Sequence, residues 1–439
     1  MARQLAIEAA GAAISPARLA VALARRGAER RSVARALAAP APALDDAPAR
    51  PASPRDGAPL TIFVSAGEAS GDLHAANLVR ELRARRGSLR VVAFGGERLR
   101  EAGAEVLEPL AASAGMGLTH GLGSIGAHVA LARRFVEALD RERPAVCAFV
   151  DNPGFHLVLA SLARARGIPA IQYVCPQTWA WAPWRWRRMA RDLVAAYAIA
   201  PFEAPYFAER GVRVRYVGHP LGDELTPRSI EARTDGRADA PLVALLPGSR
   251  RAEVARNLPA MLRVAARIRT AVPAARFAVA LSDPVRAAEA EPILREHAVG
   301  FPVELHRGSL DPVFREARLT LAKSGTVTLE VAHHAVPLVV FYRLARRSDR
   351  LLASLLLNVP HIAILNLLAG REIVPEILAT GEADELVAAA AAVGLLRDGP
   401  ARDAQLAALA EIRRVVSRPG AAARVAESLL AIAERAPAS

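Results

Sequence analysis

The 439-residue sequence is poor in lysine, cysteine and aromatic residues. Lysine occurs once, at Lys323, so the formal net charge of +13 comes almost entirely from arginine, and a bias this one-sided indicates that part of the charge reflects coding composition. The two cysteines, Cys147 and Cys175, exclude a disulfide framework and a cysteine metal cluster and are typical of a reducing cytosol. The remaining positive charge is still compatible with a basic surface that binds phosphates or acidic lipid.

The sequence also lacks a clean apolar run of about 18 residues, which a membrane-spanning helix needs. Residues 351–370 come closest, but Asn358, Pro360, His361 and Asn366 interrupt them. The N-terminus has neither the compact apolar core nor the cleavage site of a secretory signal. With 52% hydrophobic and 23% charged residues, the composition predicts a globular protein of two or three domains.

The chain reads as an α/β fold with two doubly wound, Rossmann-like parallel-sheet domains facing a central cleft. Apolar, β-branched runs alternate with helical patterns in both halves. We expect strands at 60–64, 90–96, 145–151, 169–175 and 195–201, at 275–281 and 337–343, and at the start of 242–250 and 319–326. Ligands of such sheets bind beyond the carboxyl ends of the strands.

The composition and the alternation of strand and helix patterns divide the chain into four parts. Residues 1–58 are rich in alanine, arginine and proline and predict a weakly ordered extension whose first half has helical character. Residues 59–228 and 229–415 form the two Rossmann-like domains, and residues 416–439 a C-terminal helix.

Three loops of small residues follow expected strands and are candidates for binding phosphate and sugar. Helix N-termini with free N–H groups bind phosphate, an arginine adds a bidentate clamp, and an acidic residue one turn into the helix suits a ribose diol. Each loop alone is as compatible with a plain turn, and none has the P-loop or dinucleotide fingerprint. The candidates are Gly67 and Glu68 in the first loop, Gly248, Ser249 and Arg250 in the second, and Ser324, Gly325, Thr326 and Glu330 in the third.

Asp151 ends the third expected strand and is the candidate catalytic base. A carboxylate at this edge is suited to accept a proton from an attacking hydroxyl, although Asp151 could also simply cap the helix after Pro153. His156 falls inside that helix, where packing is a better expectation than chemistry. No cluster of side chains has the spacing of a metal site, so we expect neither a metal nor another cofactor.

All four tryptophans lie between residues 179 and 186, interleaved with arginine. Such a segment suits stacking on nucleobases, burial at a membrane interface or a corner of the core. We expect Trp179 and Trp181 to pack beside the cleft, and Trp184 and Trp186 to contact a membrane or acyl chains.

The ordered motifs resemble those of the lipid-A-disaccharide synthase family, inverting glycosyltransferases of the GT-B fold. The resemblance runs from about residue 60 to 430. It is carried by "AGEASGD" (66–72), "MGL" (116–118), "DNPGF" (151–155), "YVCPQTWAW" (173–181), "PFE" with Tyr206, "GHPL" (218–221), "LLPGSRRAEV" (245–254), "SGTVTLE" (324–330) and "NLLAGREIVPEIL" (366–378).

The resemblance implies transfer of 2,3-diacylglucosamine from its UDP derivative to 2,3-diacylglucosamine 1-phosphate. It implies an essential aspartate at Asp151, an essential arginine at Arg250, and a UDP side lined by residues 324–330 and by Asn366, Arg371 and Glu372. Residues 59–228 become the acceptor side and 229–415 the UDP-sugar side. We expect a cytoplasmic protein, peripheral to the inner face of the inner membrane, whose partners are the two lipid substrates and that surface but no nucleic acid. The sequence does not indicate an oligomeric state.

Departures from the family pattern cluster on the acceptor side. His120 takes the place of a glutamate, Gly154 of an acid, His156 of an amide and Cys175 of a serine. They leave room for a divergent GT-B paralogue with another acceptor. A UDP-GlcNAc 2-epimerase of the same fold, or a non-catalytic basic protein that binds membranes or nucleic acid, are further alternatives. UDP release from a diacylated UDP-glucosamine, measured with and without the diacyl monosaccharide phosphate, separates these from the synthase.

Overall fold

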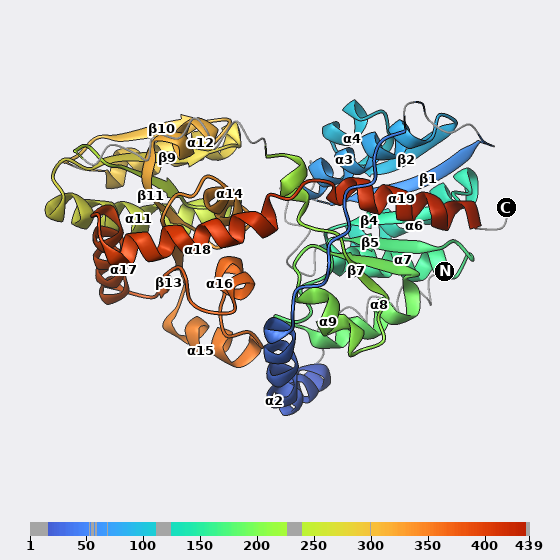
Figure 1. Ribbon diagram of the computed structural model, residues 1–439, viewed down its shortest axis with the longest axis horizontal. Helices are drawn as coiled ribbons and strands as arrows, with labels where there is room; N and C mark the ends of the chain where they lie inside the picture. The colour runs from blue at the N-terminus through green and yellow to red at the C-terminus, as the bar shows by residue number, and fades with distance from the viewer. Residues whose placement is uncertain are drawn as a thin grey trace. The chain divides into compact units, whose positions relative to one another are not determined.

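The computed structural model describes residues 16–435 apart from positions 52, 54–56, 58, 68, 111–123, 226–238 and 299. The chain forms two compact units (Figure 1). The first contains Met1–Asp223 and Pro419–Ser439, and the second contains Glu224–Arg418. The α/β prediction of two parallel-sheet domains is confirmed, and the C-terminal helix belongs to the first unit.

The first unit is built on a seven-stranded parallel sheet in the order β3-β2-β1-β4-β5-β6-β7. Five of these strands were expected from continuous apolar runs. The edge strands β3 and β7 were missed because they are short and mix polar with apolar residues. The strands are β1 (Leu60–Ala66), β2 (Leu89–Gly95), β3 (Glu105–Pro109), β4 (Val146–Val150), β5 (Ala170–Tyr173), β6 (Ala195–Ala198) and β7 (Val214–Tyr216).

Helices cover both faces of this sheet. On one face, α3 and α19 pack against each other and against the central strands, and Val425 and Leu429 of α19 join the core around Ile62 and Val64. On the other face Phe63 meets Phe94 and Phe135 edge to face, each at a ring-centroid distance of 5.1 Å. The helices are α2 (Pro16–Ala38), α3 (Ala69–Arg85), α4 (Glu97–Glu101), α6 (Ser124–Glu142), α7 (Pro153–Arg164), α8 (Trp186–Asp192), α9 (Glu203–Ala208) and α19 (Ala421–Arg435), with short 3₁₀ turns η2 (Pro183–Arg185) and η3 (Pro220–Asp223).

The second unit has a six-stranded parallel sheet in the order β10-β9-β8-β11-β12-β13. Its four central strands were expected, whereas the outer β10 and β13 were missed. The strands are β8 (Leu242–Leu246), β9 (Arg276–Leu281), β10 (Val303–Arg307), β11 (Ala317–Ala322), β12 (Leu338–Arg343) and β13 (Glu376–Ala379). The helices are α11 (Arg251–Ala271), α12 (Pro284–His297), α13 (Asp311–Glu316), α14 (Val327–His333), α15 (Arg347–Leu356), α16 (Ile364–Ala369), α17 (Glu382–Leu396) and α18 (Pro400–Val416).

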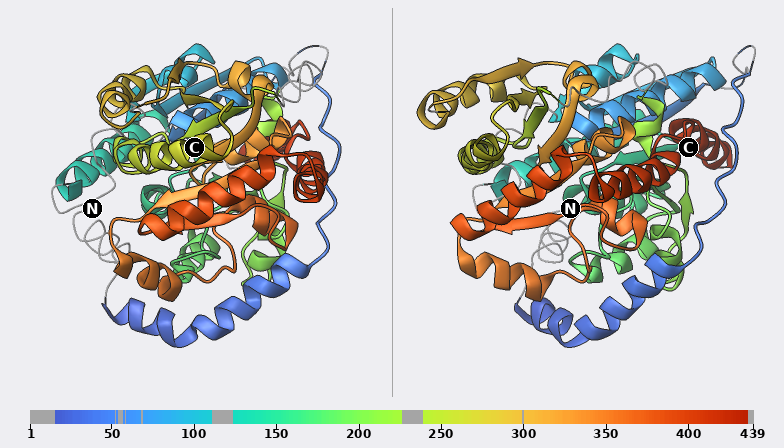
Figure 2. Two further views of the ribbon diagram at one scale, coloured as in Figure 1. Left: turned by 90° about the vertical axis from the view of Figure 1, so that its left-hand side faces the viewer. Right: turned by 60° about the vertical axis from the view of Figure 1, so that its left-hand side comes forward.

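The N-terminal extension contains a helix, α2, which begins in the half for which the sequence predicts helical character. Helix α2 packs against α9 and η2 and buries Val33 and Ala36. Ser32 donates a hydrogen bond to Glu209 at 2.7 Å, and Glu29 pairs with Arg210 at 2.7 Å. In the segment between α2 and β1, the residues that the structure describes form no further helix or strand (Figure 2). Low-complexity composition did not reveal these contacts because they depend on residues about 180 positions away.

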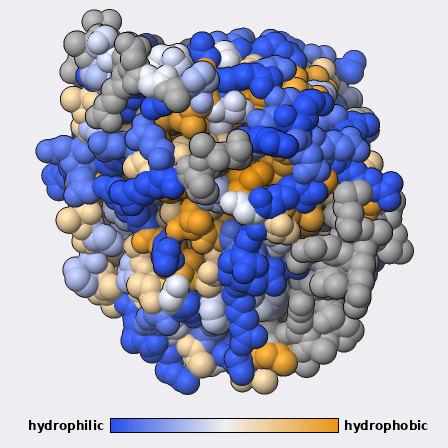
Figure 3. All heavy atoms as spheres, turned by 90° about the vertical axis from the view of Figure 1, so that its right-hand side faces the viewer, coloured by the Kyte–Doolittle hydropathy of each residue, from blue (hydrophilic) through white to orange (hydrophobic). Residues whose placement is uncertain are grey.

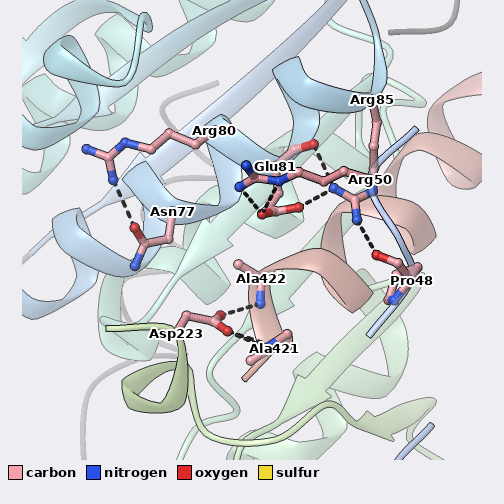
Figure 4. A network of polar contacts seen from close by, with 10 residues as sticks. Pro48, Arg50, Asn77, Arg80, Glu81, Arg85, Asp223, Ala421 and Ala422 are labelled. Atoms are coloured by element: carbon pink, nitrogen blue, oxygen red, sulfur yellow. Dashed lines mark hydrogen bonds and ion pairs between the residues drawn. The ribbon is translucent and has the colours of Figure 1, made fainter. Parts of the chain in front are cut away.

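Polar contacts tie the extension and the C-terminal helix to the first unit (Figure 4). Arg85 donates to the Pro48 carbonyl at 2.8 Å, and Glu81 of α3 pairs with both Arg50 and Arg85. The Asp223 carboxylate accepts hydrogen bonds from the backbone N–H groups of residues 420–422, at the start of α19. The carboxylate therefore satisfies donors that would otherwise be orphaned at that helix end.

Among the described residues, no helix is long and apolar enough to cross a bilayer. On the face drawn in Figure 3, hydrophilic residues predominate and hydrophobic residues gather in a band across the middle.

Candidate active site

In the first unit, three candidate segments meet at the carboxyl edge of the sheet. In register, Ala66 of β1 pairs with Val150 of β4, which pairs with Tyr173 of β5. The loop at Gly67, the catalytic candidate Asp151 and residue 174 therefore follow three adjacent strands. This is the edge at which parallel sheets bind ligands.

The backbone at this edge takes an unusual conformation. Asp151, Asn152 and Val174 have φ values of +55°, +43° and +66°. For a β-branched residue such as valine this region is strongly disfavoured, and such strain persists only where the surroundings hold it. Here two side chains donate to the Asp151 carbonyl: Gln172 Nε2 at 2.9 Å and His156 Nδ1 at 2.7 Å. They fix the backbone from which the Asp151 carboxylate projects.

His156 connects that carbonyl to β1. Its ring is fully buried, and Nε2 lies 2.9 Å from the Ser65 hydroxyl. A carbonyl only accepts, so Nδ1 carries the proton and Nε2 accepts from Ser65. Burial lowers the pKa of His156 to about 4, so the ring is neutral at pH 7. His156 thus packs, as expected, and it also holds Asp151 in place.

We expect His156→Asn to change how stability depends on pH. The pKa of His156 is lower in the folded than in the unfolded chain, so its contribution is present above pH 6.5 and is lost as pH falls toward about 4. The difference in free energy of unfolding between wild type and variant should shift by about 1.4 kcal/mol per pH unit in this window. Urea unfolding at several pH values measures it. His306→Asn, on β10, is the control; a flat difference between wild type and His156→Asn would contradict the buried neutral ring.

The first glycine of the "AGEASGD" loop is required by a close approach. A Cβ at Gly67 would lie 2.2 Å from Asn152 Nδ2, so a larger residue there would displace the turn beside Asp151. Asp72 accepts hydrogen bonds from the N–H groups of Gly96 at 2.6 Å and Arg98 at 3.0 Å, so it caps α4. Glu68, His120 and the "MGL" motif lie outside the described residues.

The tryptophan segment divides into buried and exposed parts. Trp179 is buried and donates to Glu203 at 3.0 Å, as its expected packing role requires. Trp181 is 42% exposed, contrary to expectation, and Arg185 stacks over its ring at 4.5 Å. Trp184 and Trp186 are partly exposed.

In the second unit, two candidate loops lie side by side. β8 and β11 are neighbours, with Leu246 in register with Ala322, and the Lys323 N–H donates to the Leu246 carbonyl at 2.9 Å. The loops at residues 247–250 and 323–326 therefore leave the sheet together. Gly248 has φ +124°, and a Cβ there would lie 2.5 Å from Glu253 Oε2, so only glycine fits this turn.

Glu253 organises the basic groups of these loops. Its carboxylate accepts from the N–H groups of Ser249 at 3.2 Å and Arg250 at 3.4 Å, at the start of α11. It also pairs with Lys323 at 3.1 Å and Arg250 at 3.6 Å. The expected anion site at this helix end therefore already holds a carboxylate, and the 63% exposed Arg250 side chain remains reachable. The glutamate three residues after Arg250 is a capping-box signal, which could have predicted this contact from the sequence.

The third candidate loop, residues 323–330, provides the Ser324 hydroxyl, a turn at Gly325 and the carboxyl group of Glu330. Ser324 donates to the Ile362 carbonyl at 3.2 Å, Gly325 accepts from the Thr328 hydroxyl at 2.7 Å, and Thr326 is exposed. Burial, with added repulsion from Glu224 and Asp311, raises the pKa of Glu330 to about 7. A carboxyl with such a pKa is suited to share hydrogen bonds with a diol.

Asn366 has a supporting role rather than the expected ligand contact. It is fully buried, its oxygen accepts from the N–H groups of Ile373 at 2.7 Å and Val374 at 2.9 Å, and its amide donates to Val374 and Glu376. These partners use its hydrogen-bonding capacity. Of the other residues of that motif, Arg371 and Glu372 are exposed, and Arg371 lies 3.8 Å from Glu411.

Comparison with known proteins identifies the family. A family model described as lipid-A-disaccharide synthetase matches residues 62–422. Lipid-A-disaccharide synthases from Anaeromyxobacter sp. (strain K) and Myxococcus xanthus (strain DK1622) are 40% and 36% identical over 374 and 376 residues, which cover 84% and 85% of this chain and 97% of each relative. The chain belongs to the lipid-A-disaccharide synthase family. It is accordingly a glycosyltransferase of lipid A biosynthesis.

Solved structures support the fold of this family member. A putative UDP-N-acetylglucosamine 2-epimerase from Listeria monocytogenes has a TM-score of 0.57 at 13% identity and covers 85% of this chain and 96% of its own. The glycotransferase of kitacinnamycin has a TM-score of 0.55 at 19% identity and covers 86% and 100%. Identities this low show the fold alone, and it is GT-B.

Proposed function

We propose that the chain transfers 2,3-diacylglucosamine from its UDP derivative to the 6-hydroxyl of 2,3-diacylglucosamine 1-phosphate, releasing UDP and forming a β(1→6) disaccharide. The family match over residues 62–422 is the observation that carries this proposal. The candidate residues support it. Asp151 lies at the carboxyl edge of the sheet in the first unit, and Arg250 and Lys323 lie at the carboxyl edge of the sheet in the second.

In the proposed reaction Asp151 is the general base. Its carboxylate takes the proton of the acceptor 6-hydroxyl as the oxygen bonds to the anomeric carbon. The bond from that carbon to the diphosphate oxygen breaks on the opposite face, and UDP leaves with the electron pair. Attack opposite the leaving group inverts the anomeric configuration.

The leaving diphosphate is assigned to the second unit. Arg250, at the start of α11, is proposed to donate two parallel hydrogen bonds to phosphate oxygens, and Lys323, which pairs with the same Glu253 carboxylate, to add a second positive charge. Ser249 and Thr326 supply hydroxyls, and Glu330 is proposed to bind the ribose diol. Among the described residues no group of His, Cys, Asp and Glu is placed to hold a metal ion.

Two of the four departures from the family pattern, His156 and Gly154, are compatible with the usual acceptor. His156 is fully buried beneath Asp151, so it does not face a ligand. Gly154 is exposed, with no atom within 4 Å of a Cβ built there. Compared with the acid of the family pattern, Gly154 therefore removes a side chain and does not add a group that would clash with the acceptor.

Release of UDP from a diacylated UDP-glucosamine tests the proposal. We expect release only when the diacyl monosaccharide phosphate is present, equally in EDTA, with the disaccharide detected by mass spectrometry. Release that does not depend on the acceptor, or conversion of UDP-GlcNAc to its 2-epimer, would overturn it.

Both proposed substrates carry fatty acyl chains, so the enzyme must take them from a membrane surface, and we place it at the inner face of the inner membrane. Trp184 and Trp186 are partly exposed, and Arg187 lies 5.5 Å over the Trp186 ring. An indole beside a guanidinium suits the boundary between acyl tails and phosphate headgroups.

We expect Trp184→Ser with Trp186→Ser to weaken binding to anionic vesicles by about tenfold, because two interfacial rings are lost. Vesicle sedimentation measures it, with UDP affinity as the internal reference. Val194→Ser, which removes another exposed apolar side chain of the first unit, is the control. Unchanged vesicle binding by the double variant would assign both rings to packing alone.

A further inference from the structure

Helix α15 leaves apolar side chains in solvent. Leu351 is 64% exposed, Leu355, one turn later, is 42% exposed, and Leu356 is 37% exposed. Side chains four residues apart lie on one face of a helix, so Leu351 and Leu355 are neighbours. Leucines this exposed within two turns mark a contact surface.

Positive charge accompanies these leucines. Residues 343–357 contain four arginines and one acid, Asp349. Arg346 and Arg350 are exposed, and Arg350 lies 3.1 Å from Asp384, while Asp349 accepts from the Arg346 N–H and caps the helix. Leucine with flanking arginine is the composition of a short helix that lies in the headgroup region of an anionic leaflet.

Helix α15 lies within residues 343–362, which we call the α15 segment. Both ends of this segment are hydrogen-bonded to the candidate donor loops. At its start, the Arg343 N–H donates to Asn257 Oδ1 at 2.9 Å, and the Asn257 amide donates to the Pro247 carbonyl at 2.7 Å, next to Gly248. At its end, the Ile362 carbonyl accepts from Ser324 at 3.2 Å. The segment therefore bridges the loops at 247–250 and 323–326.

We propose that the leucine and arginine surface of α15 (Arg346, Arg350, Leu351, Leu355 and Leu356) docks the second unit on an anionic lipid leaflet. The inference rests on the proposed function, since a lipid-linked donor brings this unit to a membrane. A leaflet accounts for both parts of the surface: acyl chains take up the leucines and anionic headgroups neutralise the arginines. Docking by α15 brings the attached donor loops to the leaflet from which the donor is taken.

The test compares two matched double variants of the full chain. Leu351→Ser with Leu355→Ser removes the apolar face, and Val285→Ser with Leu386→Ser removes side chains that are 55% and 50% exposed elsewhere in the same unit. We expect the α15 variant, and not the control, to bind vesicles of phosphatidylglycerol and phosphatidylcholine at least about tenfold more weakly. Thermal unfolding verifies that both variants are folded.

A charge variant and a UDP titration complete the test. Arg346→Gln with Arg350→Gln should reduce the preference for anionic over pure phosphatidylcholine vesicles and flatten its salt dependence. Wild-type vesicle affinity in the α15 variant would overturn the proposal. So would a smaller oligomer for Leu351→Ser with Leu355→Ser than for the wild type, which would assign the surface to a second copy of the chain. UDP affinity should be unchanged in every variant; absence of UDP binding in the wild type would instead contradict the proposed function.

Discussion

Replacing Asp151 with asparagine should lower kcat at least about 10²-fold while UDP affinity stays close to that of the wild type. The substitution preserves the shape of the side chain but removes its basicity, and positioned bases contribute roughly 10²–10⁴-fold. Asparagine also tolerates the left-handed backbone that Asp151 adopts at φ +55°, so the fold should survive. Single-turnover kinetics with both lipid substrates, together with UDP titration, measure the two quantities.

A matched variant distinguishes the loss of the catalytic base from the loss of one negative charge anywhere in the first unit. Asp140→Asn removes another carboxylate of the first unit, one that pairs with Arg166 at 2.7 Å on the surface, and should leave kcat unchanged. If Asp151→Asn turned over nearly as fast as Asp140→Asn, the base would have to be sought elsewhere, with Glu68 and His120 as the next candidates.

Much of the fold follows from local sequence, because central parallel strands are continuous apolar runs. Edge strands do not have this signal: β10 reads "VELHR", mixes polar with apolar residues and has no fully buried position. The strand ends that carry Asp151 and Arg250 could be predicted for the same reason as the central strands, since the carboxyl edge of a parallel sheet is defined once its strands are known.

The partners of the candidate residues could not be predicted in the same way. That Gln172 donates to the Asp151 carbonyl depends on β4 and β5 being neighbours. That the Asn366 side chain is fully hydrogen-bonded depends on how the chain folds back at residues 373–376. Whether a side chain is exposed also depends on contacts that the local sequence does not reveal. Trp179 and Trp181 are two residues apart, yet Trp179 is buried and Trp181 is exposed.

The surroundings of Arg250 make its role sharply testable. Its side chain is largely exposed, which suits a ligand contact better than a structural one, and Glu253 restrains it from one side at 3.6 Å. Lys323 pairs with the same carboxylate oxygen, Glu253 Oε1, at 3.1 Å, so the two cations share one acid and together keep a net positive charge for an incoming diphosphate. Charge grows on the leaving oxygen as the glycosidic bond breaks, and a preorganised donor there is worth more in the transition state than in the ground state.

We therefore expect Arg250→Ala to cost about 2–4 kcal/mol of transition-state stabilisation, which corresponds to roughly 30- to 1,000-fold in kcat/KM. Arg250→Lys should recover part of this, because it restores the charge without the two-pronged geometry of guanidinium. Arg251→Ala removes the adjacent arginine, whose side chain is 82% exposed and lies 3.7 Å from Glu289, and should have little effect. Because Arg250 also contacts Glu253 at the start of α11, thermal unfolding of Arg250→Ala must match that of Arg251→Ala for the loss to be assigned to catalysis. Near-normal turnover of Arg250→Ala at saturating donor would show that Lys323 and the loop backbone suffice for the diphosphate.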